Sequence, residues 1–280
     1  MILPSNPTQL DIQKAIKDLE SQMQQLFTSG SNGKAALVAA IEAGGGTVET
    51  AGTYPTFAEL VAGVESIPTL PDIPEGFVLL SYLQSTRTQI INTGFTPTLG
   101  RHTFECEFEL TEPNSAVSLF GARTNSGATT NPARAGNYYF NDVNRPTVYI
   151  GTTANVAALP SGQELLPDTR YTVRLEVDES TRSGLRQITG VPDAVINNFN
   201  GTAVTLDSLA LFGAQTQGEF AEFGAFRIYS FKIWDNDILV RDFAPCFDAL
   251  KDKPCMYCFV TRRAFYNVRP GADFLYGVDS

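Results

Sequence analysis

The chain has 280 residues, of which 43% are hydrophobic and 18% are charged, with 19 Phe and 10 Tyr. This length suits one large sandwich or two smaller domains, and the apolar content predicts a packed core and excludes a wholly disordered chain. The net charge of −10 excludes nucleic-acid binding through a basic face and attraction to an anionic bilayer. No stretch reaches the ~20 apolar residues of a membrane span, and Met1–Pro4 does not begin a secretory leader. We therefore expect a protein made in the cytoplasm, with no membrane insertion.

A helix with a narrow apolar seam is predicted in residues 7–27, within an N-terminal segment of residues 1–30. The apolar residues are spaced four, three, four and three apart, which is an a/d heptad pattern. About two and a half heptads are too few to hold a coiled coil alone in dilute solution. Two interpretations stay open: a helix that packs on its own domain, and a short oligomerising stem, which we favour. The seam consists of Ile12, Ile16, Leu19, Met23 and Leu26.

Residues 31–67 are expected to form a small module of two short helices. The first is the Ala-rich segment 33–41, and the second follows Thr56-Phe57-Ala58-Glu59, which has the pattern of a capping box. Helices of this size bury little apolar surface, so the module should attach to a neighbouring domain or a partner chain. Residues 68–76 contain three prolines and are predicted to form an extended spacer.

Residues 77–280 are predicted to be β-structure. Short segments with alternating apolar and polar residues are separated by turn signals, and the clearest is a hairpin turn at Asp235-Asn236-Asp237. Two similar strings, SLFGAR at 118–123 and ALFGAQ at 210–215, predict strands in equivalent core positions, each with a glycine at a close approach or a bulge. The predicted fold class is mainly β: a two-sheet jelly-roll sandwich preceded by a small helical region.

The last quarter of the chain carries the most informative motifs. RIYSFKIWDN (227–236) is followed by LVRDF (239–243), PC (245–246), PCMY (254–257) and FYN (265–267). In this order they resemble the end of the concanavalin-like (laminin-G-like) sandwich of structural proteins from tailed bacteriophages and prophages. The resemblance covers residues 77–277, and residues 33–67 resemble a small module of phage tail and fibre proteins.

The resemblance implies a binding and assembly protein and not an enzyme. It implies a homotrimeric fibre or baseplate appendage on a virion, with other virion proteins and a bacterial surface glycan or protein as partners. A capsid head fibre or decoration protein, a glycan-active enzyme and a free lectin are the alternatives. No cofactor is expected. Laminin-G-like sandwiches often carry calcium, and Asp235-Asn236-Asp237 has suitable oxygens, but a hairpin turn needs the same residues and is favoured.

The four cysteines leave three interpretations open. Cys255 and Cys258 have the spacing of a zinc ligand pair, with Cys246 nine residues before Cys255. The single His, His102, lies far away beside Cys106, and the resembling proteins usually have an acidic residue at the position of Cys258, so a shared zinc site is disfavoured. A Cys246–Cys255 bridge is the second interpretation, and buried free thiols are the one that we expect.

The segment ECEFE suggests the main catalytic alternative. On a strand, Glu105, Glu107 and Glu109 share one face, while the residues between them face a core. Neighbouring carboxylates would lie about 6.6 Å apart, against about 5–5.5 Å in retaining glycosidases. We favour a solvent-facing polar side of an outer strand, and one His is too few for a convincing nucleophilic triad.

The predicted ligand-binding surface is formed by loops. Residues 124–137 and 152–162 are rich in small residues and lie beside tyrosines, whose flat amphipathic rings suit sugars or protein epitopes. Inert connections on a rigid scaffold are the alternative. The candidate ligand contacts are Arg123, Arg134, Asn137, Tyr138, Tyr139 and Tyr149.

Overall fold

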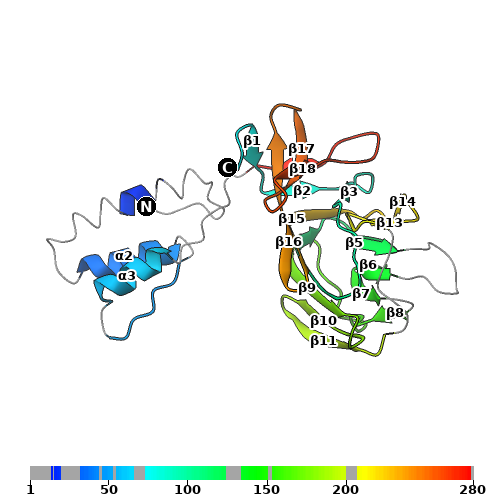
Figure 1. Ribbon diagram of the computed structural model, residues 1–280, viewed down its shortest axis with the longest axis horizontal. Coiled ribbons are helices and arrows are strands. Elements are labelled where there is room, and N and C mark those ends of the chain that lie inside the picture. Colours follow the sequence, from blue (N-terminus) through cyan, green and yellow to red (C-terminus); the bar gives the residue numbers. More distant parts are fainter. Residues whose placement is uncertain are drawn as a thin grey trace. The chain divides into compact units, whose positions relative to one another are not determined.

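The computed structural model describes Lys14 and residues 16–19, 32–43, 46–52, 55–65, 73–123, 134–150, 153–199 and 207–278, and the structural statements below concern these residues. The chain divides into two compact units, one ending at Ile73 and one spanning Pro74–Val278 (Figure 1). The division lies within the predicted spacer. In the described part of the chain, no helix has the length and apolar character needed to span a bilayer.

The first unit contains α2 (Asn32–Ala43) and α3 (Phe57–Glu65). The predicted capping box is confirmed at the start of α3. The Glu59 N–H donates to Thr56 Oγ1 (3.2 Å), and the Thr56 N–H donates to Glu59 Oε2 (2.5 Å). A small apolar core joins the helices, and its buried members are Leu19, Leu37, Ile41 and Leu60.

Two residues of the predicted oligomerising seam, Ile16 and Leu19, fall within the described residues. Leu19 is buried against α2 and α3 of its own chain, and Ile16 is half-buried. Ile12, Met23 and Leu26 lie outside the described residues. Leu19 therefore has a packing role within the chain, and oligomerisation through the seam stays a prediction.

The second unit is a sandwich of two mainly antiparallel sheets, which confirms the predicted fold class. Within the described residues, the larger sheet has the order β11-β10-β9-β4-β15-β16-β17-β18, with β1 on the end of β16 and β2 between β15 and β19. The smaller sheet has the order β14-β13-β5-β6-β7-β8, with β12 between β3 and β5, and lies on the right in Figure 1. The strands of the larger sheet are β1 (Phe77–Leu79), β2 (Tyr82–Gln84), β4 (Arg101–Leu110), β9 (Arg170–Asp178), β10 (Ser183–Ile188), β11 (Val191–Asn197), β15 (Phe226–Asp235), β16 (Ile238–Asp248), β17 (Lys253–Cys258), β18 (Arg263–Phe265) and β19 (Leu275–Gly277). Those of the smaller sheet are β3 (Ile91–Asn92), β5 (Val117–Arg123), β6 (Arg134–Asp142), β7 (Arg145–Ile150), β8 (Thr153–Val156), β12 (Ala210–Leu211), β13 (Ala214–Thr216) and β14 (Glu219–Ala221).

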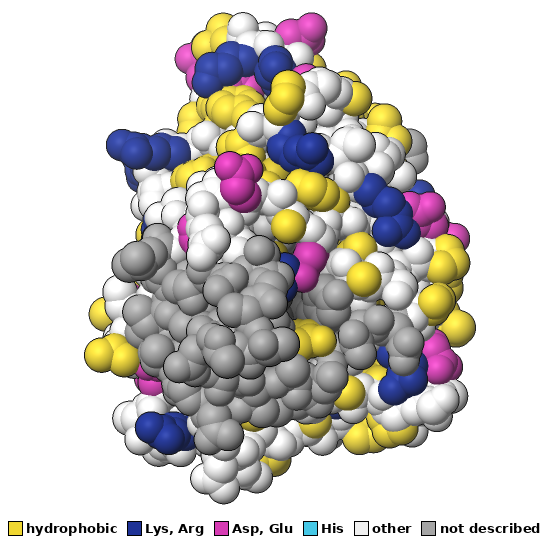
Figure 2. Space-filling view, turned by 90° about the vertical axis from the view of Figure 1, so that its right-hand side faces the viewer, with side chains coloured by type: hydrophobic (Ala, Val, Ile, Leu, Met, Phe, Trp, Pro, Cys, Tyr) yellow, Lys and Arg dark blue, Asp and Glu magenta, His cyan; other side chains and the backbone are white. Residues whose placement is uncertain are grey.

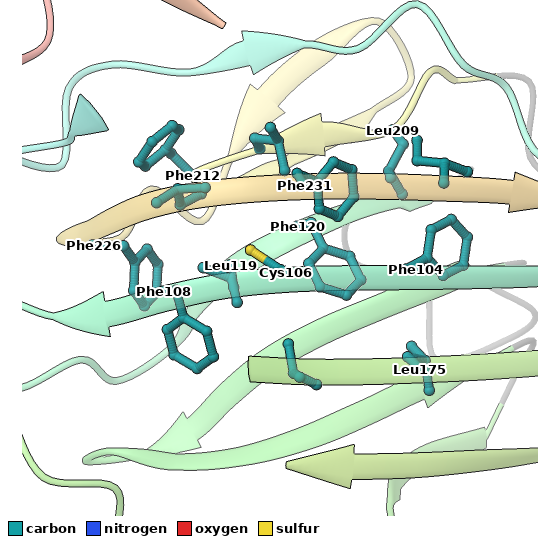
Figure 3. Close-up of a cluster of buried hydrophobic side chains, with 14 of the residues drawn as sticks. Phe104, Cys106, Phe108, Leu119, Phe120, Leu175, Leu209, Phe212, Phe226 and Phe231 are labelled. Atoms are coloured by element: carbon teal, nitrogen blue, oxygen red, sulfur yellow. The ribbon is translucent and has the colours of Figure 1, made fainter. Parts of the chain in front are cut away.

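Alternate side chains of β4 enter the core between the sheets, as predicted. Phe104, Cys106 and Phe108 are each at most 1% exposed. Phe120 of β5 packs between Phe104 and Phe231 of β15, with ring centroids 5.7 Å and 5.3 Å away (Figure 3). Because aromatic side chains bury large apolar areas, this cluster contributes strongly to the packing of one sheet against the other.

The two LFGA strings lie next to each other in the smaller sheet. β12 pairs with β5 so that Leu211 is opposite Phe120, and both Phe120 and Phe212 are fully buried. A Cβ at Gly213 would come within 2.9 Å of the Ala221 carbonyl oxygen. The glycine therefore allows the close backbone approach that the repeated string predicted.

The predicted hairpin turn joins β15 to β16. Asp235 pairs with Ile238, and Asn236 and Asp237 have φ of 49° and 64°, as in a two-residue type I′ hairpin. The tip is fixed to β4, because the Asn236 N–H donates to the Arg101 carbonyl (2.7 Å) and Asn236 Oδ1 accepts the Arg101 N–H (3.2 Å). The hairpin prediction is confirmed.

His102 lies beneath this hairpin and is 2% exposed. Its ring lies near those of Phe95 and Phe104, at centroid distances of 5.8 Å and 6.2 Å. Nε2 is 3.4 Å from Asp235 Oδ1. Burial lowers the pKa of the imidazole below 6.5, and the negative charges of Asp235 and Glu179 oppose that shift. The neutral ring is the form that packs in the fold.

The free energy of unfolding should consequently fall as the pH drops below about 6.5. The His102 pKa is higher in the unfolded chain, which therefore binds the proton first, and this loss continues down to the folded pKa. His102→Gln removes this contribution. Urea midpoints measured at about pH 7.5 and about pH 5.5 should differ more for the wild type than for the variant. An equal difference in both proteins contradicts the prediction.

Candidate functional site

Arg123, a predicted ligand contact, ends β5 and is nearly buried. Its side chain is 7% exposed and forms an ion pair with Glu222, whose side chain is 15% exposed. Arg123 Nε–H also donates to Thr216 Oγ1 (3.2 Å). The Ser118 hydroxyl donates to Glu222 Oε2 (2.7 Å), and the Ser118 N–H donates to the Glu222 carbonyl (2.8 Å). We call these four residues the Arg123–Glu222 bridge.

The bridge forms because the β13–β14 hairpin lies beside β5. Thr216 is opposite Arg123 in the parallel pairing of β13 with β5. The turn of this hairpin is held by Asp207, whose carboxylate accepts the N–H groups of Gln217 (2.6 Å) and Gly218 (2.7 Å). The Arg123 guanidinium is thus held by groups whose own positions are fixed, and the bridge is a rigid feature of the smaller sheet.

The other predicted ligand contacts lie on β6, which is next to β5, and on β7, which is next to β6. Arg134 is opposite Arg123, and Asn137 is opposite Tyr149. Tyr149 is 9% exposed, while the side chains of residues 134–139 lie outside the described part of the structure. The six predicted residues therefore occupy three adjacent strands: Arg123 is on β5, Arg134, Asn137, Tyr138 and Tyr139 are on β6, and Tyr149 is on β7.

Two predicted loops are partly wrong. Residues 134–137 belong to β6, and Thr153–Val156 forms β8. Small polar residues are weak strand formers by themselves, but β-propensity depends on context, and pairing with β5 and β7 supplies the ladder contacts that override it. The candidate surface is therefore built on strands of a sheet more than on loops.

Figure 2 shows the side of the sandwich that carries the smaller sheet. In the described part of this face, Lys and Arg side chains are interspersed with Asp and Glu. Such a face offers donors and acceptors of both signs to a ligand, and it is neither a basic nor an acidic patch.

The three carboxylates of β4 lie on the outer face of the larger sheet, as predicted, but β4 is a central strand between β9 and β15 and not an outer strand. Glu105 pairs with Arg174 (3.1 Å), Glu107 with Arg170 (2.6 Å) and Glu109 with Arg227 (3.0 Å). The arginines come from β9 and β15, which flank β4, so the pairs cross the sheet from strand to strand. We call this set the charged ladder.

Three half-buried aromatic rings, those of Tyr82, Tyr229 and Trp234, lie among the arginines of the charged ladder. Burial and a hydrogen bond to Glu109 raise the pKa of Tyr229. The stacked guanidinium groups cover ring faces that a sugar would need. This arrangement favours a structural role for the ladder. The guanidinium carbon of Arg170 lies 3.9 Å from the centroid of Tyr229, that of Arg227 5.0 Å from Tyr82, and that of Arg174 5.2 Å from Trp234.

A polar cavity of about 220 Å³ lies at the start of β4, where β4, β9 and β10 adjoin. Two of its charged groups, Arg101 and Glu176, pair with each other (3.0 Å), and Arg101 also pairs with Asp237 at the hairpin tip (3.3 Å). The third, Asp178, accepts hydrogen bonds from Ser180. The cavity is lined by Arg101, Glu176, Val177, Asp178, Ser183, Gly184 and Leu185.

The turn considered for calcium uses its oxygens in other bonds. Asp237 pairs with Arg101, Asn236 Oδ1 accepts the Arg101 N–H, and Asp235 Oδ1 accepts a hydrogen bond from Asn236 Nδ2 (3.0 Å). Among the described residues, no group of three or more His, Cys, Asp or Glu is arranged to hold a metal ion. The hairpin turn accounts for these residues.

The sulfurs considered for zinc diverge. All four cysteines are buried free thiols, as expected. Cys258 belongs to the main core, whereas Cys246 and Cys255 belong to a separate small cluster. Cys255 and Cys258 thus lie on different sides of β17 and do not converge on one ion.

No family model matches this sequence, and neither does any curated protein. Comparison with solved structures finds a partial likeness to the CBM40 domain of the Ruminococcus gnavus IT-sialidase bound to alpha2,3 sialyllactose. That comparison has 15% identity and a TM-score of 0.43, and it covers 59% of this chain and 92% of the other.

Two structures of sialidases show the same partial likeness. The NanB sialidase of Streptococcus pneumoniae is matched at 15% identity and a TM-score of 0.40, over 58% of this chain and 27% of the other. A mutant Trypanosoma rangeli sialidase that displays trans-sialidase activity is matched at 14% identity and a TM-score of 0.37, over 48% of this chain and 20% of the other. This chain spans only about a quarter of these sialidases, and the likeness assigns it to no family.

Proposed function

We propose that this chain is a structural virion protein of a bacteriophage or prophage, a fibre or tail appendage whose sandwich binds a carbohydrate or protein on the bacterial surface. The virion role is supported by the motifs of residues 227–267 and by a helical unit that precedes a separate sandwich. The appendage is a homotrimer attached to other virion proteins, and a head fibre or decoration protein is the alternative position on the particle. Light scattering on the full chain measures its mass in solution and so tests the trimer. Immunogold labelling of virus particles shows where on the particle the protein lies.

The observation that carries the binding role is the gathering of the predicted contacts on β5, β6 and β7. These three strands are adjacent in the smaller sheet, beside the rigid Arg123–Glu222 bridge. Strands hold their side chains more precisely than loops do, so a ligand bound here meets a preorganised surface. Tyrosines and fixed polar groups on such a surface suit hydroxyl-rich or peptide ligands.

Substitutions on β6 test this surface. Tyr138 and Tyr139 are consecutive residues of β6, and as a rule consecutive residues of a strand alternate between the two faces of a sheet. Tyr138→Ala and Tyr139→Ala should therefore have different effects. The variant of the outward-facing tyrosine should bind the ligand about tenfold more weakly, and the variant of the inward-facing one should be less stable instead. A bacterial glycan array, followed by titration calorimetry with the best ligand, measures the affinity.

Tyr276→Ala is the matched control, because Tyr276 is 44% exposed on β19 of the larger sheet. It should leave binding unchanged. The binding surface is wrongly placed if both β6 variants bind as the wild type does. The enzyme alternative predicts glycan cleavage that Glu105→Gln and Glu107→Gln abolish, and we expect no cleavage by the wild type.

A further inference from the structure

Cys246 and Cys255 face each other across the β16–β17 ladder. The register of the two strands is continuous and places the two residues directly opposite. Side chains of directly opposed residues project from the same face of a sheet. Both residues are fully buried.

The other two cysteines have no thiol opposite them. Cys106 is opposite Phe231 and Val173, and Cys258 is opposite Phe243. Both belong to the main core between the sheets. Cys246 and Cys255 instead form a small buried cluster with Tyr257, packed against partly buried neighbours that include Phe77, Leu79, Phe259, Ala264 and Tyr266.

The backbone spacing suits a covalent link. The Leu80 N–H donates to the Pro245 carbonyl (2.9 Å), so the Pro245 backbone faces β1 and the Cys246 backbone faces β17. Cys246 and Cys255 are therefore a hydrogen-bonded pair, whose Cα atoms are about 5.5 Å apart in such ladders, within the disulfide range of about 4.4–6.8 Å. The Cβ atoms of such pairs start about 5 Å apart and must approach to about 4 Å. Closure thus needs side-chain rotation and a small shift of two strands.

We propose that Cys246 and Cys255 are a disulfide-forming pair that closes when the folded protein meets a disulfide oxidant such as glutathione disulfide. One thiolate attacks the oxidant, forms a mixed disulfide and releases one glutathione. The second thiolate attacks the cysteine sulfur of that mixed disulfide and releases the other glutathione. Two protein thiols thereby lose two protons and two electrons, and one glutathione disulfide becomes two glutathione molecules.

The surroundings of the pair make the closure slow. Burial raises the pKa of both thiols, that of Cys255 to about 12, and the thiolate is the attacking species. Phe77 and Tyr257 are part of the apolar cover, with ring centroids 4.9 Å apart. Reaction must therefore await local opening of the cluster, and it should be faster in mild urea than in buffer.

Thiol counting tests the proposal. The reduced full chain is incubated with glutathione disulfide in mild urea, quenched with N-ethylmaleimide, denatured and weighed by mass spectrometry. The expected product is a monomer in which two of the four thiols are no longer alkylated. Persistence of all four thiols, or a disulfide-linked dimer, overturns the proposal.

Single substitutions identify the pair. Cys246→Ser and Cys255→Ser should each form no disulfide within the chain: the thiol that lost its partner stays free or keeps one bound glutathione, which the mass reveals. Cys258→Ser, the matched control, should still lose two, and trypsin should then release residues 242–251 linked to 252–262. Oxidation should raise the Tm of the Cys258→Ser variant by about 5 °C, because the bridge lowers the conformational entropy of the unfolded chain. A bridge that forms in Cys246→Ser overturns the assignment, and none of these results depends on ligand binding.

Discussion

Replacing Arg123 by methionine should lower the free energy of unfolding by about 3–4 kcal/mol. The substitution leaves the Glu222 carboxylate in its partly buried position without the guanidinium, with the Ser118 hydroxyl still donating to it. Methionine replaces much of the apolar arginine stem, so the loss reports the charge and the hydrogen bonds more than the packing. Urea unfolding followed by the fluorescence of Trp234, the single Trp, measures the stability of the sandwich.

A second substitution distinguishes the cost of the unpaired Glu222 charge from the loss of the other contacts of the bridge. Arg123→Met combined with Glu222→Gln should recover more than half of the loss, because no charge is then left buried without its partner. Lys253→Met is the matched control: Lys253 pairs with Asp273 at the surface (3.6 Å, 51% and 39% exposed) and should cost less than about 1 kcal/mol. The structural account of the bridge is wrong if Arg123→Met costs no more than Lys253→Met.

The bridge changes how the predicted ligand contacts should be tested. Arg123 already holds Glu222 and Thr216, so a loss of binding in an Arg123 variant would mix ligand contact with damage to the smaller sheet. Tyr138 and Tyr139 are better probes, because their adjacent positions on β6 supply an internal control for each other.

The features that were predictable from the sequence are local ones. Alternation in FECEF placed Phe104 and Cys106 in the core and Glu105 on the outer face, because a strand has a period of two. The backbone of the turn at Asn236-Asp237 and the capping box at Thr56 have sequence signals within a few neighbouring residues. Each of these patterns spans only a few residues, and the folded chain contains the local structure that it predicts.

The features that were not predictable depend on register between distant strands. From the sequence, Arg123 was predicted to contact a ligand. The pairing of β5 with β13 instead places its side chain against Thr216 and Glu222. The spacing of Cys246 and Cys255 was compatible with a bridge, but their direct opposition follows from the β16–β17 register. The alternation within one strand indicates which residues face the core, but it does not name the strand that lies beside it.

The role of Asn114 was likewise not predictable from the sequence, because most of its hydrogen-bond partners are distant in the chain. It lies between β4 and β5, is fully buried and accepts the Ala225 N–H on Oδ1 (2.9 Å). Its Nδ2 donates to the carbonyls of Ala225 (2.9 Å) and Glu112 (3.0 Å). Its backbone exchanges hydrogen bonds with Asn144 in the β6–β7 turn. One side chain thus joins the entry of β15 to the connection that leads into β5.

Asn114→Ala should therefore destabilise the sandwich by about 3 kcal/mol, or about 10 °C in Tm, because it leaves the buried Ala225 N–H without its acceptor. Asn197→Ala, at an exposed position of β11, is the control and should change the Tm by no more than about 2 °C. Asn114→Asp keeps the acceptor oxygen but loses the Nδ2 donor and buries a carboxylate, so it should not restore stability. Equal Tm values for Asn114→Ala and Asn197→Ala would show that the entry of β15 and the β4–β5 connection hold together without this side chain.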